Sequence, residues 1–259
     1  MVKPILDVKG MTVTSADGRT VLDDVSFTIH AGEVLGIAGV EGNGQAELVD
    51  AVMGIRPTAA GVITLRGENI SRLSTRRRRE AGMAFIPEDR HRQGVMLEAS
   101  LWENRILGHQ TRRPNVRGPL IDRRGAKADT QRIVDEYDVR TPSIDVAATA
   151  LSGGNQQKFI VGREMSGKPI VLIASHPTRG VDVGAQAAIW DHIRRARTEH
   201  LAVLLISADL DELIGMSDKL AVILRGRLVS QLDPKSVTPQ ALGSAMTGAG
   251  EDAGEEVAS

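Results

Sequence analysis

The stretch EVLGIAGVEGNGQAELVDAVM (residues 33–53) decides the fold class of this chain. It starts with an apolar run of strand length, residues 33–39, which stops at a glycine-rich loop. After the loop, apolar residues from Leu48 to Met53 recur at helical spacing. A strand, a glycine loop and a helix in this order are the beginning of an α/β unit.

Three later apolar runs extend this unit into a sheet. They cover residues 170–175, 201–207 and 219–225, and their apolarity is continuous rather than alternating. Continuous apolarity is typical of strands covered on both faces. Residues 183–197, between the first two runs, carry an apolar stripe at helical spacing, so we predict strand–helix–strand and a mainly parallel sheet core.

The remaining segments predict the domain organisation. Residues 5–30 indicate two strands joined at Asp17-Gly18, hence an N-terminal antiparallel β region. The polar, arginine-rich middle indicates a helical insertion of about residues 89–165 in a core of 1–88 and 166–248. We therefore expect a single domain over residues 1–248, and an acidic tail at 249–259 that is disordered.

Composition excludes several classes of function. Lys and Arg number 32 against 33 Asp and Glu, and this balance argues against a nucleic-acid partner bound by bulk electrostatics. The arginine run 76–79 is interpreted as a solvated helix face. The chain has no cysteine, which excludes disulfides and thiolate metal sites, and its six histidines show no metal-ligand spacing. No membrane span or cleavable signal is recognisable, so we expect a soluble chain.

The glycine loop has the spacing of a loop that cradles phosphates with backbone N–H groups at a helix N-terminus. Two side chains depart from that pattern. Gln45 stands where a lysine reaches the β- and γ-phosphates, and Ala46 where a hydroxyl binds Mg²⁺. The pattern also fits a tight turn without a ligand. The candidate residues of the loop are Gly39, Gly42, Asn43, Gly44, Gln45, Ala46 and Glu47.

A second motif, LSGGNQQK, occupies residues 151–158. Ser152 can cap the helix that follows, and Gly153 and Gly154 allow the backbone to approach an anion that the helix dipole favours. A capped helix without a ligand is the simpler interpretation. The motif resembles the signature sequence of ABC-transporter ATPases, in which Asn155 and Gln156 complete the signature.

Other segments resemble this family in the same order. IPEDR (86–90) is similar to the Q-loop region, IVLIASHPTRGVDVGA (170–185) to the Walker B strand and the D-loop with Asp182, and ISADL (206–210) to the switch region. The resemblance runs from about residue 5 to 248. It is closest to the C-terminal nucleotide-binding half of the double-length ATPases that drive sugar and nucleoside importers, and GIAGVEGNGQAEL with LGSAMTG favours the nucleoside branch.

The departures from the family pattern concern one ATP site. The resemblance places Gln45 and Ala46 at the phosphate lysine and the Mg²⁺ hydroxyl, as described above. It places Ser175 at the Walker B aspartate, His176 at the catalytic glutamate, Glu88 at the Q-loop glutamine and Ala208 at the switch histidine. We expect this site to be non-hydrolytic. His176 is either an unconventional base or a polar residue that closes the strand end.

The signature, in contrast, is intact. In the family two halves stack head to tail, so the resemblance implies that this chain donates Ser152, Gly153 and Gly154 to ATP and Mg²⁺ held by a catalytically intact partner half. The expected partners are that half, transmembrane permease subunits and, indirectly, a substrate-binding protein, on the cytoplasmic side of the cell membrane. By family the protein is a transport ATPase, but we expect this half alone to be inactive. The alternative is a non-hydrolytic regulatory or interaction module with the same fold.

Overall fold

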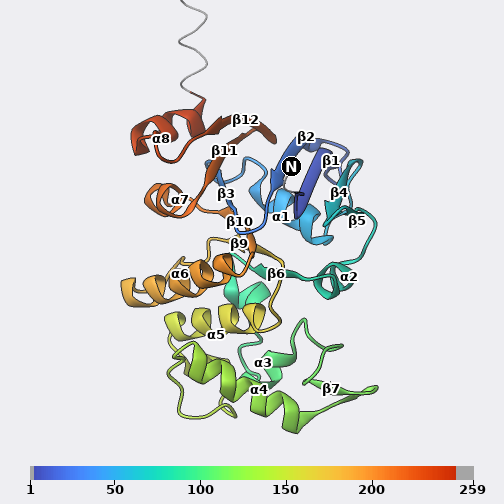
Figure 1. The fold of residues 1–259 in the computed structure, drawn as a ribbon, viewed down its shortest axis with the longest axis vertical. Coiled ribbons are helices and arrows are strands. Elements are labelled where there is room, and N and C mark those ends of the chain that lie inside the picture. Colours follow the sequence, from blue (N-terminus) through green and yellow to red (C-terminus); the bar gives the residue numbers. More distant parts are fainter. Residues whose placement is uncertain (1–2, 249–259) are drawn as a thin grey trace, which may run out of the picture. The chain divides into compact units, whose positions relative to one another are not determined.

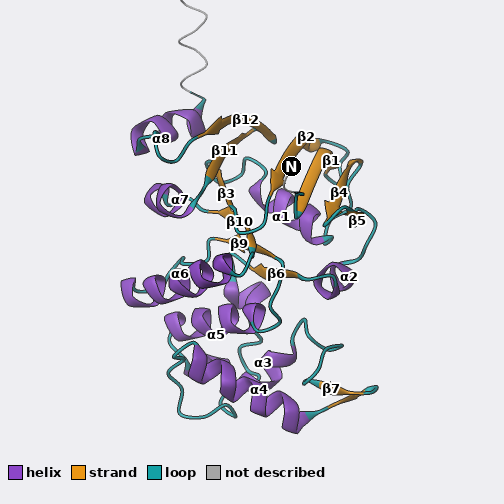
Figure 2. Cartoon of the chain, in the orientation of Figure 1, coloured by secondary structure: helices purple, strands orange, loops and turns teal. Residues whose placement is uncertain are grey.

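The computed structural model describes residues 3–248 and divides the chain into two compact units (Figures 1 and 2). The first unit contains Met1–Met83, Ile170–His176 and Arg197–Ser259, and the second contains Ala84–Pro169 and Pro177–Ala196. The tail 249–259, which was expected to be disordered, lies outside the described residues.

The N-terminal β region forms a four-stranded antiparallel sheet in the order β2-β1-β4-β5. The hairpin predicted around Asp17-Gly18 is present, because Thr14 pairs with Thr20 across that turn. Buried and less buried residues alternate along most of β1, as expected for a sheet with one face on a core. The strands are β1 (Leu6–Thr14), β2 (Thr20–Ile29), β4 (Ala60–Leu65) and β5 (Glu68–Asn69).

The predicted parallel core is also present in the first unit, where five strands stand in the order β12-β11-β3-β10-β9. Neighbouring strands from β11 to β9 are parallel, and β12 is antiparallel to β11. All five residues of β3, β9 and β10 are buried, which explains their continuous apolarity. The strands are β3 (Val34–Ala38), β9 (Val171–Ser175), β10 (Ala202–Ile206), β11 (Lys219–Leu224) and β12 (Arg227–Leu232).

The helices of the first unit are short. Helix α1 follows the glycine loop and buries the apolar positions predicted for it, from Leu48 to Met53. Within residues 3–248, no helix has the length and apolarity needed to cross a membrane. The helices are α1 (Gln45–Met53), α2 (Thr75–Glu80), α7 (Leu210–Met216) and α8 (Pro239–Thr247).

The interpretation of residues 76–79 as a solvated helix face is wrong for one of the four arginines. Arg78 is 2% exposed, and its guanidinium donates to the carbonyl oxygens of Ala51 and Val52 at 2.8 and 2.7 Å. It also donates to the carbonyl oxygens of Ser71 and Leu73. Because the last carbonyls of a helix have no partner within the helix, Arg78 satisfies the C-terminal end of α1.

The second unit is mainly helical, as predicted, and α5 is its central helix because nearly all of its residues are buried. Tyr137, after α4, stacks on His192 of α6 with ring centroids 4.0 Å apart. A small hairpin, β7–β8, was not predicted. The elements are β6 (Met83–Ile86), a π-helix (Arg90–Gly94), α3 (Leu101–Ile106), β7 (Val116–Arg117), β8 (Leu120–Ile121), α4 (Arg123–Glu136), a 3₁₀ turn (Ala148–Ala150), α5 (Gly153–Met165) and α6 (Val183–Thr198).

Candidate functional site

The glycine loop is a tight turn between β3 and α1. Gly42 and Gly44 have φ of 89° and 111°, a region that side chains rarely adopt. A Cβ on Gly44 would also lie 2.7 Å from Leu22 Cδ2, and one on Gly39 would lie 2.7 Å from the side chain of Gln45. The glycine spacing noticed in the sequence therefore has a backbone reason in the turn itself, with or without a ligand.

Gln45 fills the loop with its own side chain. Its Oε1 accepts the backbone N–H of Asn43 at 3.0 Å, and its Nε2 donates to the carbonyl oxygen of Val40 at 2.9 Å. An N–H group that a phosphate-cradling loop offers to an anion is thus already paired within the loop. The neutral amide supplies no positive charge in place of a lysine.

Asn43 anchors the loop to the segment after β11. Its Oδ1 accepts the N–H of Arg225 at 2.8 Å, and its backbone carbonyl accepts the N–H of Gly226 at 2.9 Å. Its Nδ2 donates to the carbonyl oxygen of Val40 at 2.8 Å. Ala46 is exposed and Glu47 lies half-buried in the first turn of α1, with no side-chain cap at that helix start. The loop geometry is therefore held by hydrogen bonds internal to the protein.

Three of the predicted site residues lie at the carboxyl ends of β9 and β10, and the glycine loop follows β3. Since β3, β10 and β9 are parallel neighbours, these ends meet at the same sheet edge. Ser175 is 6% exposed and ends β9, His176 follows it, and Ala208 is exposed after β10. Ser175, His176 and Ala208 thus lie at one sheet edge, and none of the three carries a carboxylate.

The backbone of His176 ends strand β9 and turns the chain. Its backbone N–H donates to the carbonyl oxygen of Ile206 at 2.7 Å, and its φ of 48° turns the chain out of β9. The side chain is half-buried. A non-glycine residue at positive φ is uncommon, so this position marks a sharp turn at the strand end.

The residues at this edge do not fit a Mg²⁺ ion. Mg²⁺ prefers carboxylate and hydroxyl oxygens, whereas position 46 is alanine and position 176 is histidine. The hydroxyl of Ser175 is buried in the end of the strand. Within residues 3–248, no cluster of three His, Asp or Glu side chains is suited to a metal ion. We therefore derive no metal-assisted step at this site.

The signature residues start α5 in the second unit. Ser152 is exposed at the N-cap, as predicted, and its Oγ accepts the N–H of Asn155 at 3.4 Å and the side-chain Nδ2 of Asn155 at 2.9 Å. A Cβ on Gly153 would lie 2.7 Å from Arg90 Nη2, and one on Gly154 would lie 3.1 Å from a carboxylate oxygen of Asp182. A side chain at Gly153 would displace the flexible end of Arg90, and one at Gly154 would press on Asp182 and Ala185.

Glu88, the residue predicted for the Q-loop position, is ion-paired. Glu88 binds Arg179, and Arg90 Nη1 donates to the carbonyl oxygen of Arg179 at 3.0 Å. Next to it, His91 Nε2 lies 3.0 Å from Gln156 Oε1 on the signature helix. Arg179 was not predicted as a site residue, and its only signal in the sequence is its place within the segment 170–185 that resembles the Walker B strand and the D-loop.

Asp182, the residue predicted for the D-loop, caps the start of α6. Asp182 Oδ1 accepts the N–H of Ala185 at 3.0 Å, and this bond lowers the pKa of the Asp182 carboxyl. Asp182 is exposed and therefore ionised near neutral pH. Its exposed carboxylate lies close to Gly154, in the first turn of α5.

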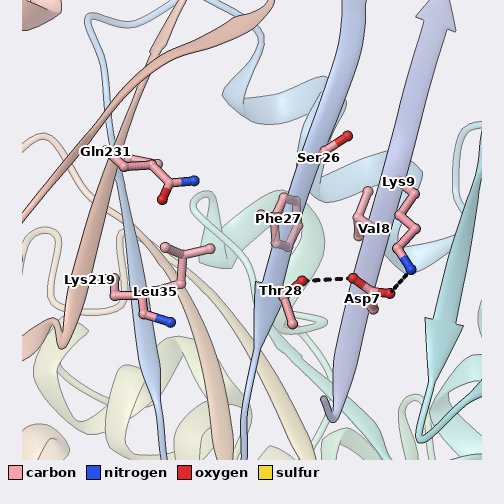
Figure 3. A pocket seen from close by; sticks show the side chains of 10 residues that line it. Asp7, Val8, Lys9, Ser26, Phe27, Thr28, Leu35, Lys219 and Gln231 are labelled. Atoms are coloured by element: carbon pink, nitrogen blue, oxygen red, sulfur yellow. Dashed lines mark hydrogen bonds and ion pairs between the residues drawn. The ribbon is translucent and has the colours of Figure 1, made fainter. Parts of the chain in front are cut away.

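A separate hollow of about 360 Å³ lies between β1–β2 and β3–β11–β12 (Figure 3). Asp7 binds Lys9 at 2.9 Å and Thr28 at 2.7 Å on one side of it, and Lys219 and Gln231 lie on the other. Burial raises the pKa of Asp7, but the bonds from Lys9 and Thr28 outweigh it and the net direction is down. None of the residues predicted for the site lines this hollow.

The strand, glycine loop and helix at the edge of a mainly parallel sheet, with an antiparallel sheet before them, define the class: a P-loop NTPase of the α/β type. A family model described as "ABC transporter" matches residues 22–179, and the chain belongs to that family. Its fold is shared by a solved structure titled "Structure of ATP binding subunit of ABC transporter", with a TM-score of 0.74 and 18% identity over 94% of this chain and 99% of that one.

The relatives with similar sequences include import ATP-binding proteins. The chain is 42% identical over 244 residues to the guanosine import ATP-binding protein NupO of Bacillus subtilis (strain 168), covering 94% of this chain and 48% of that protein. It is 38% identical over 244 residues to the nucleoside import ATP-binding protein NupA of Lactococcus lactis subsp. cremoris (strain MG1363), with the same coverage. The chain thus spans about half the length of the curated relatives it matches.

Proposed function

We propose that this chain is the degenerate, non-hydrolytic ATP-binding half of an ABC importer ATPase. In this proposal it donates its signature to ATP bound by a catalytically intact partner half. The observation that carries the proposal is the contrast between its two motifs. Gln45 is bonded into its own glycine loop, while Ser152 caps α5 and remains exposed.

The chemistry of the loop supports a non-hydrolytic site. Losing the lysine, the Mg²⁺ hydroxyl and the Walker B carboxylate removes two or three charge-assisted contacts of about 1.5–3 kcal/mol each. Affinity for ATP would then fall by roughly a hundredfold to several thousandfold or more. A phosphoryl transfer also needs a group to position the attacking water. Without a carboxylate at 175 or 176, that group is missing.

The geometry of the signature supports donation to a γ-phosphate. Helix α5 has 13 residues, and its N-terminus carries partial positive charge and N–H groups without a partner in the helix. Gly153 and Gly154 keep side chains away from these groups, so an anion can approach the backbone. Arg90, beside Gly153, adds positive charge next to this helix start.

Partners, location and substrate class follow from the same proposal. We infer a second ABC ATPase half, fused or separate, and transmembrane permease subunits to which the closure of the two halves is transmitted. The protein then works on the cytoplasmic side of the membrane, with one domain over residues 1–248 whose insertion is 89–165. The relatives NupO and NupA are named for guanosine and nucleoside import, which favours a nucleoside over a simple sugar.

The test is to add this chain to an ATPase half of the same importer class that has an intact lysine, aspartate and glutamate. We expect Mg-ATP turnover of the mixture to exceed that of the partner alone. A Ser152→Arg variant of this chain should abolish the increase, because it fills the anion site at the start of α5. Ser166→Arg at the C-terminal end of the same helix is the control.

The regulatory alternative predicts a different result. If the chain binds the partner half but turnover is the same with the native chain and with Ser152→Arg, the signature is not used. The chain is then an interaction module with an ABC fold, and the donor proposal is wrong.

A further inference from the structure

A small hairpin in the second unit differs from its surroundings in charge and exposure. In β7–β8, Val116 pairs with Ile121 and Arg117 pairs with Leu120. The turn between the strands is Gly118-Pro119, where Gly118 has a φ of 63°. Figure 1 shows the β7 end of this hairpin reaching away from α3 and α4 of the same unit.

The segment around the hairpin, residues 110–124, is strongly basic, and we call it the basic hairpin. It contains five arginines and one acidic residue, Asp122, in a chain whose net charge is −1. The carboxylate of Asp122 accepts the N–H of Gly125 at 2.9 Å as the cap of α4. The arginines are Arg112, Arg113, Arg117, Arg123 and Arg124.

Three of these arginines are exposed and carry uncompensated charge. Arg113, Arg117 and Arg124 form no ion pair within residues 3–248. Arg123 lies over the ring of Trp102, with its guanidinium carbon 5.9 Å from the ring centroid. The charges of Arg113, Arg117 and Arg124 thus face the solvent without an ion-pair partner in residues 3–248.

The hairpin also exposes two adjacent large apolar side chains. Leu120 is 71% exposed and Ile121 is 55% exposed. As consecutive strand residues they project from opposite faces, Leu120 on the face of Arg117 and Ile121 on that of Val116, so the hairpin exposes an apolar side chain on each face next to arginines. Two such side chains on one small basic hairpin give it an amphipathic surface. Such a surface matches the boundary of an anionic bilayer, where apolar side chains enter the headgroup region and basic ones meet phosphates.

We propose that the basic hairpin binds an anionic phospholipid surface. Leu120 and Ile121 enter the headgroup region, and Arg113, Arg117 and Arg124 bind lipid phosphates. A nucleic acid fits less well, because aliphatic side chains offer no ring on which bases stack. The inference stands on the hairpin alone, so it does not depend on the function proposed for the ATP-site motifs.

The test is flotation of the purified 259-residue chain with vesicles of phosphatidylcholine alone or mixed with phosphatidylglycerol. We expect binding to the anionic vesicles, weak binding to the neutral ones, and release at raised ionic strength. The variant Arg113→Gln/Arg117→Gln/Arg124→Gln should bind roughly a hundredfold more weakly, at about fivefold per arginine. Leu120→Ser/Ile121→Ser should bind at least about tenfold more weakly.

Two matched controls separate the hairpin from general effects of charge and polarity. Arg72→Gln/Arg76→Gln/Arg77→Gln removes the same charge at and before α2, and Ile55→Ser/Leu73→Ser removes two other exposed apolar side chains. Both controls should lose far less binding than the hairpin variants, with unfolding midpoints verifying that all variants fold.

Three results would overturn the proposal. The first is no binding to anionic vesicles. The second is an equal loss in the hairpin and control variants. The third is binding to a homopolymer RNA that depends on the arginines but not on Leu120 and Ile121, while vesicles do not bind.

Discussion

The side-chain amide of Gln45 donates to the carbonyl oxygen of Val40 at 2.9 Å, across the turn of the glycine loop. The residue at the position of a phosphate-binding lysine therefore binds the loop itself. The Oε1 of the same side chain accepts the N–H of Asn43, so the loop keeps its shape without an anion. The connection between β3 and α1 is therefore held by hydrogen bonds within the loop itself.

Adding a positive charge to the glycine loop should tighten nucleotide binding without producing turnover. We expect Gln45→Lys/Ala46→Thr to bind ATP roughly ten- to a hundredfold more tightly than the native chain, since one charge-assisted contact is worth about 1.5–3 kcal/mol. Turnover should stay absent, because positions 175 and 176 still lack a carboxylate. Calorimetric titration with Mg-ATP measures the first effect, and phosphate release measures the second. Gln240→Lys, on the exposed side of α8, is the control and should change neither.

Arg78 should be essential for the stability of the first unit. Replacing it with methionine removes four hydrogen bonds to carbonyl oxygens, two of which belong to Ala51 and Val52 at the end of α1. We expect a loss of about 3–5 kcal/mol in the free energy of unfolding, measured by urea denaturation. Arg77→Met, at an exposed neighbour, should change it by less than about 0.5 kcal/mol. Similar values for the two variants would contradict the role given to Arg78.

Tyr137 should make stability fall at alkaline pH. Burial raises the pKa of Tyr137 from 10.0 to about 12. Between these values the unfolded chain ionises its tyrosine and the folded chain does not, so stability is full below pH 10 and declines as pH rises towards 12. The total loss is about 2–3 kcal/mol. Tyr137→Phe should lack this part of the decline. Because the chain has a single tyrosine, the tyrosinate absorbance of the folded protein reports this group directly, and a midpoint near 10 would contradict the prediction.

Gly162 should be required by the close approach of α4 to α5. A Cβ there would lie 2.6 Å from Ile133 Cγ2 and 2.9 Å from Tyr137 Cδ2. Gly162→Ala should therefore lower stability by about 1–3 kcal/mol, despite the better helix propensity of alanine. Gly215→Ala in α7 has open space around it and should be neutral or stabilising by up to about 1 kcal/mol. Thermal unfolding of the two variants side by side gives the comparison.

The strands of the core could be predicted because burial on both faces leaves an unbroken apolar run, as in residues 202–206. The role of Arg78 could not, because a run of arginines carries no sign of which one meets the end of another helix. The pairing of Glu88 with Arg179 joins residues 91 positions apart, and no local pattern encodes it. The two-residue strands of β7–β8 are too short for a periodic signal. At the glycine loop, the sequence shows that position 45 is not a lysine. It does not show that the side chain of Gln45 accepts a hydrogen bond from the N–H of Asn43.

The central claim is that this chain has lost its own ATP chemistry, and Mg-ATP binding and turnover by the isolated chain test it most directly. We predict no turnover, and binding no tighter than about millimolar, from the contacts that Gln45 and Ala46 cannot make. The measurement should be repeated on dilution and with His176→Ala. Turnover that survives dilution and is lost in His176→Ala would contradict the account, because His176 would then be the base of a working site.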